Sequence, residues 1–280
     1  MGWLGRRRAK AQVKGALGDF TLPSFPGTVL DSLSALRDPS LTMAGIAERL
    51  AVDPGLCARL LALAGSTAYA LRHPVRDVGH AVSLLGRGEV EALVLSVAVP
   101  RLLPEHPSPS FDSGRFWRAS ARRATTAKRL AEALEPGRKA EAFTASLLQD
   151  MAVPLLAEVH GEPYARVLDA WRHEGGDLTA RELDLFGFDH ASIGGFVAEK
   201  WGFPPNLVAA LGDHHVPDAK EVPLSVRLVA SLGEGEPDEE RDALVVTAHE
   251  RFGLVSDQVS AVVDEGMRLG DELAARMRAA

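Results

Sequence analysis

Residues 143–150 read FTASLLQD, an apolar run that ends in an amide and a carboxylate. The run follows a proline–glycine break, and we expect one helix from Lys139 to Asp150. Similar signals recur outward along the chain, such as Asp53-Pro54, which pairs an N-cap acceptor with a proline at the first helical position. Because no segment shows the sustained alternation of a strand, the sequence predicts an all-α fold.

Helical spacing and cap residues predict the other helices as well. Thr179 and Glu182 have capping-box spacing, in which two side chains satisfy free amides at a helix start. Gly86 to Gly88 follow a helix rather than a strand, which indicates a turn and not a phosphate loop. The remaining helices are expected over residues 29–36, 43–50, 54–64, 78–85, 89–99, 115–134, 154–160, 164–171, 179–186, 189–201, 205–211, 223–232, 238–252 and 257–277.

Composition places the chain among ordinary globular proteins. It has 280 residues, of which 46% are hydrophobic and 25% charged, and its net charge is -7, so there is no strong nucleic-acid signal. The single cysteine, Cys57, excludes an internal disulfide and fits a reducing, cytoplasmic location. No apolar run reaches the roughly 20 residues of a membrane span, so we expect no such span.

The first 20 residues form a basic leader. Residues 1–14 carry five cations and no acid, which leaves a charge of about -12 for the rest of a chain whose net charge is -7. One interpretation is a solvated tail that the fold does not need. The other is an electrostatic contact with an acidic partner surface or with phosphates.

Two ordered blocks of motifs carry a family resemblance. The first block is Leu22 to Pro26, Asp53 to Tyr69, Pro74-Val75 and Ala81 to Gly86, and the second is Phe116 to Arg118, Ala142 to Asp150, Glu182 to His190, Trp201 to Pro204 and His214-His215. Together they resemble an HDOD domain, the non-catalytic relative of the HD and HD-GYP metal-dependent phosphohydrolases. The resemblance implies a bacterial, cytoplasmic regulatory protein with no general enzymatic activity. It also implies an N-terminal helical bundle packed on a degenerate HD-like helical core.

The resemblance suggests the domain organisation. A basic leader over residues 1–20 precedes an HDOD domain over 21–217. A proline-rich stretch divides that domain into an N-terminal helical subdomain, 21–108, and an HD-like subdomain, 109–217. Residues 218–280 are expected to form a C-terminal helical extension.

The metal site of the catalytic relatives is incomplete in this sequence. Those enzymes have histidine where Ala119 and Gln149 stand here; alanine supplies no ligand, and a neutral amide is a poor ligand for a transition metal. The surviving positions can in principle hold one ion, or they can act structurally as helix-end acceptors and as imidazoles near a helix end. We therefore expect no catalytic residue, no cofactor and no metal, but six vestigial metal-site positions: Ala119, Gln149, Asp150, His190, His214 and His215.

Three functions remain open. The first is a regulatory module that binds a protein partner in a signalling pathway. The second is a nucleotide-sensing module for a cyclic dinucleotide, in which Arg118, Arg122 and Arg123 contact phosphate instead of forming a solvated helix face. The third is a residual single-metal phosphohydrolase, which requires Asp150 and the histidines to converge.

Overall fold

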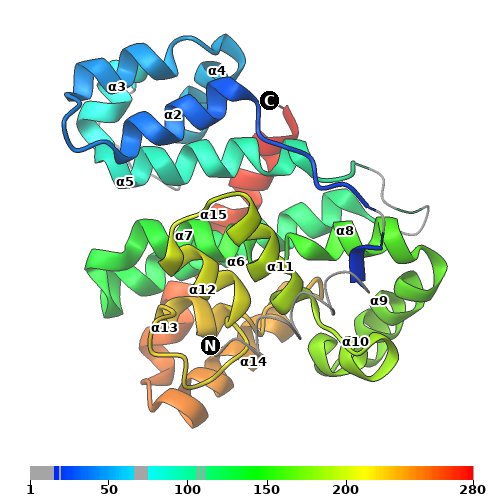
Figure 1. The fold of residues 1–280 in the computed structure, drawn as a ribbon. Helices are drawn as coiled ribbons and strands as arrows, with labels where there is room; N and C mark the ends of the chain where they lie inside the picture. The colour runs from blue at the N-terminus through cyan, green and yellow to red at the C-terminus, as the bar shows by residue number, and fades with distance from the viewer. Residues whose placement is uncertain (1–15, 19, 66–74, 106–107, 109–110, 280) are drawn as a thin grey trace.

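A computed structural model describes residues 16–18, 20–65, 75–105, 108 and 111–279, and the regular elements in these ranges are all helical (Figure 1). The predicted all-α fold is therefore confirmed. The elements are α2 (Gly27–Arg37), α3 (Met43–Leu50), α4 (Pro54–Ala64), α5 (Val78–Ala98), the 3-10 turn η2 (Pro100–Leu102), α6 (Ser113–Leu134), the 3-10 turn η3 (Pro136–Arg138), α7 (Lys139–Leu148), α8 (Ala152–His160), α9 (Glu162–Glu174), α10 (Leu178–Phe186), α11 (His190–Lys200), α12 (Pro205–Gly212), α13 (Leu224–Val229), α14 (Pro237–Phe252) and α15 (Ser256–Ala279).

The N-terminal helices pack around α5. Figure 1 shows α2, α3 and α4 on one side of α5, and α7 contacts its other side. The predicted caps form, since the Thr42 hydroxyl accepts from the amide of Gly45 and the Asp53 carboxylate accepts from the amide of Leu56 at 2.9 Å. The two helices expected over 78–85 and 89–99 join into α5, which is kinked at Gly86 (φ 80°, ψ 169°). The predicted turn is thus reduced to one residue in a conformation that favours glycine.

The centre of the molecule is α6, against which α7, α13 and α15 pack. The crossing of α15 over α6 is close because glycines lie at the contact. A Cβ built at Gly266 would lie 2.5 Å from the Cα of Thr126, and one at Gly270 would lie 2.4 Å from the Cα of Arg122. The hydroxyl of Thr125 also donates to the carbonyl of Gly266 at 2.6 Å. The C-terminal helix therefore belongs to the core and fixes the position of α6.

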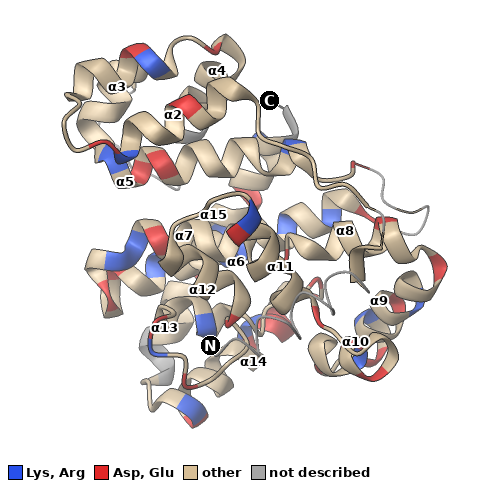
Figure 2. Cartoon of the chain, viewed as in Figure 1, with Lys and Arg blue, Asp and Glu red and all other residues tan. Residues whose placement is uncertain are grey.

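A buried ion pair links the N-terminal helices to the central ones. Glu89 on α5 lies 3.5 Å from Lys128 on α6, and both side chains are buried. Acids and bases are interspersed over the outer helices (Figure 2). The subdomain boundary at residues 108 and 109 stays a prediction.

One sequence expectation needs correction, and one was tested further. Residues 1–15 lie outside the described residues, but the end of the predicted leader is not solvated: Leu17 is 5% exposed, and the carbonyl of Ala16 lies 2.7 Å from Nε2 of His160. Residues 136–160 are long and apolar enough for a membrane span by length and composition alone, with a mean hydropathy of 1.2. However, 89% of the apolar window is buried inside the fold because α7 and α8 are core helices, so the described residues give no evidence of a membrane span.

Candidate functional site

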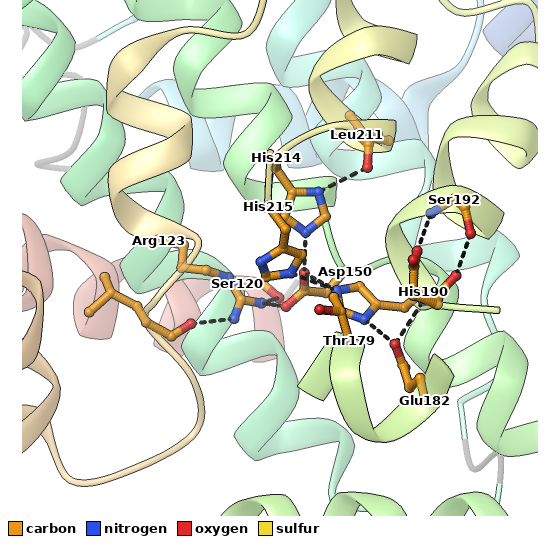
Figure 3. Close-up of polar contacts among 12 residues, drawn as sticks. Ser120, Arg123, Asp150, Thr179, Glu182, His190, Ser192, Leu211, His214 and His215 are labelled. Carbon is orange, nitrogen blue, oxygen red and sulfur yellow. Dashed lines mark hydrogen bonds and ion pairs between the residues drawn. The ribbon is translucent and has the colours of Figure 1, made fainter. Parts of the chain in front are cut away.

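Four polar side chains from separate segments converge beneath the C-terminal end of α7. The ligand atoms of Asp150, His190, His214 and His215 all lie within 4.8 Å of one another (Figure 3). Asp150 lies two residues after the end of α7, His190 is the first residue of α11, and the two adjacent histidines lie just after α12. Asp189 caps α11 by accepting from the amide of Ser192 at 2.7 Å, which fixes the start of the helix. The four surviving positions predicted from the sequence are therefore brought together.

The two altered positions of the predicted site lie in the core. Gln149 is buried, and its Oε1 has no hydrogen-bond partner among the described residues. Ala119 is buried on α6, one turn before Arg123. Neither side chain brings an imidazole to the cluster, as the sequence indicates.

Hydrogen bonds outside the cluster orient two of its imidazoles. Nδ1 of His190 bonds Oε2 of Glu182 at 2.7 Å, and Nδ1 of His214 bonds the carbonyl of Leu211 at 2.9 Å. Both Nε2 atoms consequently point at the same oxygen of Asp150, each at 3.4 Å. Outer partners of this kind orient histidines in metal sites. The arrangement is suited to hold a cation, which can be a metal ion or a proton.

The charge of Asp150 is stabilised by its neighbours. Burial alone would raise the pKa of Asp150, but the Arg123 guanidinium and the hydrogen bonds from His190 and His214 hold it well below the usual value. The carboxylate is therefore ionised at neutral pH.

The pKa values of two of the histidines are shifted in opposite directions. Burial alone would lower the pKa of His190, but the charge of Glu182 and the contact with Asp150 raise it well above the ordinary value. Burial, together with the positive charges of its neighbours, lowers the pKa of His215 to about 2. Nε2 of His215 lies 3.2 Å from Nε2 of His190, so a neutral His215 can accept a hydrogen bond from the protonated ring of His190.

Arg123 is the cation that the structure places directly on Asp150. Its Nη2 lies 2.8 Å from Oδ2 of Asp150, and its side chain is 2% exposed. The same guanidinium donates to the carbonyl of Leu232 at 2.9 Å and to the hydroxyl of Ser120 at 3.2 Å. The alternative of a solvated helix face is therefore wrong for Arg123. The signal for its real position was its spacing, four residues after Ala119 on one face of α6.

The other two candidate phosphate contacts lie elsewhere. Arg122 forms a two-pronged ion pair with Asp271 of α15, at 2.8 and 3.1 Å, and Arg118 is exposed. Both line a second hollow, of 450 Å³, that Ala119 and residues 233–237 also border. The three arginines therefore do not share one site, and their contact with phosphate stays a prediction.

Sequence analysis missed the role of Glu182. The predicted capping box is wrong, because Asp177 caps α10 by accepting from the amide of Thr179 at 2.9 Å. Glu182 is instead fully buried and accepts from the amide of His190 at 2.8 Å and from the hydroxyl of Tyr164. A glutamate one helical turn into a capped helix resembles a capping partner locally, and only the tertiary fold shows that it faces inward.

A cavity of 310 Å³ opens beside the cluster. Asp150 and the three histidines border it on one side, and Trp171 and Leu178 contribute apolar surface. Much of its remaining wall comes from residues beyond position 217, so the C-terminal extension helps to enclose the site: Arg227, Ala230, Ser231, Leu232, Thr247, Arg251 and Phe252.

The donor set can serve one ion at most. Three imidazole nitrogens and a carboxylate oxygen form a chemically suitable set for one transition-metal ion. A two-metal hydrolase needs further ligands and open positions for water and substrate. Ala119 and Gln149 do not supply them, and Arg123 already pairs with Asp150. The residues therefore fit a single ion only in part, and they do not fit a metal pair.

Helices packed around a cluster of one aspartate and three histidines define an all-α protein with a candidate metal-binding site. The HDOD domain family matches residues 22–217, and the chain belongs to this family. The expected family resemblance is thereby confirmed.

Individual proteins resemble this chain in sequence or in structure. An uncharacterized protein of Treponema pallidum (strain Nichols) is 23% identical over 204 residues, which are 71% of this chain but only 39% of that relative. The crystal structure called "Putative phosphohydrolase" from Shewanella amazonensis SB2B is 24% identical with a TM-score of 0.73, covering 95% of this chain and 98% of its own. One called "Putative signal transduction protein" from Marinobacter aquaeolei VT8 is 23% identical with a TM-score of 0.72, covering 98% of this chain and 66% of its own.

Proposed function

We propose that this protein is a non-catalytic bacterial regulatory module that acts by binding a protein partner in a signalling pathway. The ion pair between Arg123 and Asp150 is the observation that carries the proposal. A guanidinium cannot lose its proton in a protein, so this pair supplies a permanent positive charge where a catalytic relative would use a metal ion. A metal ion at Asp150 must compete with a buried contact of 2.8 Å.

Other features support the same conclusion. Hydrolysis of a phosphodiester by two metals needs ligands that Ala119 and Gln149 do not provide. Membership of the HDOD family is compatible with a regulatory role, and one structural relative is named for signal transduction. The single cysteine, Cys57, is consistent with a cytoplasmic location.

Metal analysis and a hydrolysis assay test the absence of catalysis. We expect purified protein to contain no stoichiometric iron, manganese or zinc and to leave cyclic dinucleotides intact when these metals are supplied. Asp150→Ala provides the control, since a true activity must disappear with it. Hydrolysis that needs Asp150 would overturn the non-catalytic part of the proposal.

The partner is tested separately, by affinity capture from the native host followed by reconstitution with the purified candidate. A saturable complex between the two purified proteins supports the proposal. Failure of every captured protein to bind after purification would contradict it.

One observation favours a second candidate, a residual single-metal phosphohydrolase. Nε2 atoms of two histidines point at one oxygen of Asp150, and a third ring lies within the same 4.8 Å cluster. Outer hydrogen bonds preset both of those rings, as in metal sites. Arg123→Met separates the two candidates, because it removes the competing cation. Metal binding by this variant and not by the natural protein supports the first candidate, and metal binding by the natural protein supports the second.

A further inference from the structure

The wall of the cavity beside the cluster contains arginine and hydroxyl side chains. It is formed by α13, the segment after α13, and α14, which lie beyond the residues matched by the family. Thr247 and Arg251 are four residues apart on α14 and therefore share one face of that helix. Arg227 and Ser231 contribute from α13 and the residues after it. The volume of 310 Å³ is at the lower end of the range for small-molecule sites.

Within the described part of the chain, no acid forms an ion pair with the arginines of this wall. One end of the Arg227 guanidinium donates to the carbonyl of Pro217, and its plane lies 5.5 Å from the ring centre of Phe252. Its Nε is buried and has no hydrogen-bond partner within the described chain. Arg251 is exposed, and no ion pair involving it occurs among the described residues.

The acids that border the cavity are already engaged. Asp150 is paired with Arg123 at 2.8 Å. Asp177 accepts from the amide of Thr179 at 2.9 Å and from its hydroxyl at 2.6 Å. The cavity therefore offers two guanidinium groups that have no carboxylate partner among the described residues, beside the hydroxyls of Ser231 and Thr247.

The second hollow provides a comparison within the same molecule. It is also lined by arginines, but Arg122 is bound to Asp271 at 2.8 Å, and Arg115 donates to the carbonyl of Glu234 at 2.7 Å. Glu234 and Glu236 add negative charge to its wall. Two of the three arginines of this hollow thus have acid partners, whereas Arg227 and Arg251 have none among the described residues.

We propose that this cavity binds a small phosphate-bearing molecule, with its oxyanion held by Arg227 and Arg251. Guanidinium groups match the geometry of phosphate oxygens, and hydroxyl groups add neutral donors. Trp171 and Leu178 provide an apolar surface for the rest of the ligand. The size of the cavity suits a mononucleotide better than a cyclic dinucleotide. This ligand site extends the proposed regulatory role, and it requires neither a metal nor hydrolysis.

Calorimetric titration of the full chain with AMP, inorganic phosphate and adenosine tests the proposal. The variants are Arg227→Gln and Arg251→Gln, with Arg227→Lys to keep the charge but lose the planar fork. Arg241→Gln is the matched control, because Arg241 is also on α14 but pairs with Asp242 at 2.7 Å and does not line the cavity. Since Arg227 also contacts Pro217 and Phe252, the exposed Arg251 gives the variant that is least expected to disturb folding.

We expect saturable binding of AMP, with an affinity lowered at least about tenfold in Arg251→Gln and in Arg227→Gln and unchanged in Arg241→Gln. Tighter binding of AMP than of phosphate identifies a nucleotide as the ligand source, and equal binding identifies free phosphate. The proposal is overturned if neither phosphorylated compound binds, if adenosine binds as tightly as AMP, or if Arg251→Gln and folded Arg227→Gln retain full affinity. None of these results depends on a protein partner, so the proposed regulatory role can fail or stand separately.

Discussion

Arg123→Met should destabilise the fold strongly, because it leaves the charge of Asp150 without its nearest cation. Asp150 is 13% exposed in its side chain, so water cannot replace the guanidinium fully. Removing one partner of a buried ion pair costs about 3–5 kcal/mol in free energy of unfolding. The lost hydrogen bond to the carbonyl of Leu232 is part of that cost.

Urea denaturation at pH 7 measures the effect. Arg166→Met is the matched control, since Arg166 is 76% exposed and lies 3.4 Å from Glu162 on the same helix. Exposed pairs contribute about 0–1 kcal/mol. The double variant with Asp150→Asn should lose less than the sum of the single variants, by at least about 1 kcal/mol, because the two groups interact directly. A loss below about 1 kcal/mol in Arg123→Met, equal to the control, would refute the argument.

The pH dependence of stability provides an independent check of the same pair. The pKa of Asp150 is well below its ordinary value of 3.8 in the folded state. Its contribution to stability is therefore present above that value and is lost as the pH falls through the folded pKa. In Arg123→Met this loss on acidification should be smaller.

Three further predictions concern other parts of the molecule. Gly270→Ala should lower the free energy of unfolding by about 1–3 kcal/mol through overpacking, because the new Cβ would lie 2.4 Å from the Cα of Arg122. Gly88→Ala is the control and should be neutral or stabilising, since the space around Gly88 is open. Equal melting temperatures for the two variants would contradict the close helix crossing. The pKa of His215 is about 2 in the folded protein, so only the unfolded state takes up this proton below about pH 6.5. His215→Asn should therefore reduce the loss of stability between pH 7 and pH 5 by about 2 kcal/mol. An unchanged dependence of stability on pH would refute the depressed pKa. Deletion of residues 1–18 should lower the free energy of unfolding by about 1.5–3 kcal/mol more than deletion of residues 1–15, because only the longer deletion removes the buried Leu17. Indistinguishable unfolding curves would show that the packing of Leu17 contributes nothing.

The helices were predictable because their signals are local. Thr42, Asp53 and Asp189 each cap a helix within three residues in sequence, so a short window contains the whole interaction. The kink at Gly86 was harder to predict, because a break of one residue and a full turn between two helices give the same glycine pattern in the sequence.

The site was predictable only through the family resemblance. Periodicity does not show that Asp150 meets His190 and His214, which lie 40 and 64 residues further along the chain. Arg123 and Glu182 were misinterpreted because their partners are set by tertiary packing, and each has an ordinary local role available on a helix. The contact of α15 with α6 is likewise long-range, although the spacing of Gly266 and Gly270 offered a signal for close helix packing.

The most direct test of the central claim is a measurement of metal content. The natural protein and Arg123→Met are equilibrated with manganese, iron or zinc and measured side by side. The claim is that Arg123 supplies the positive charge at Asp150 that a metal ion supplies in catalytic relatives. It predicts far less than one equivalent in the natural protein. About one equivalent of tightly bound metal in the natural protein, lost in Asp150→Ala, would contradict it.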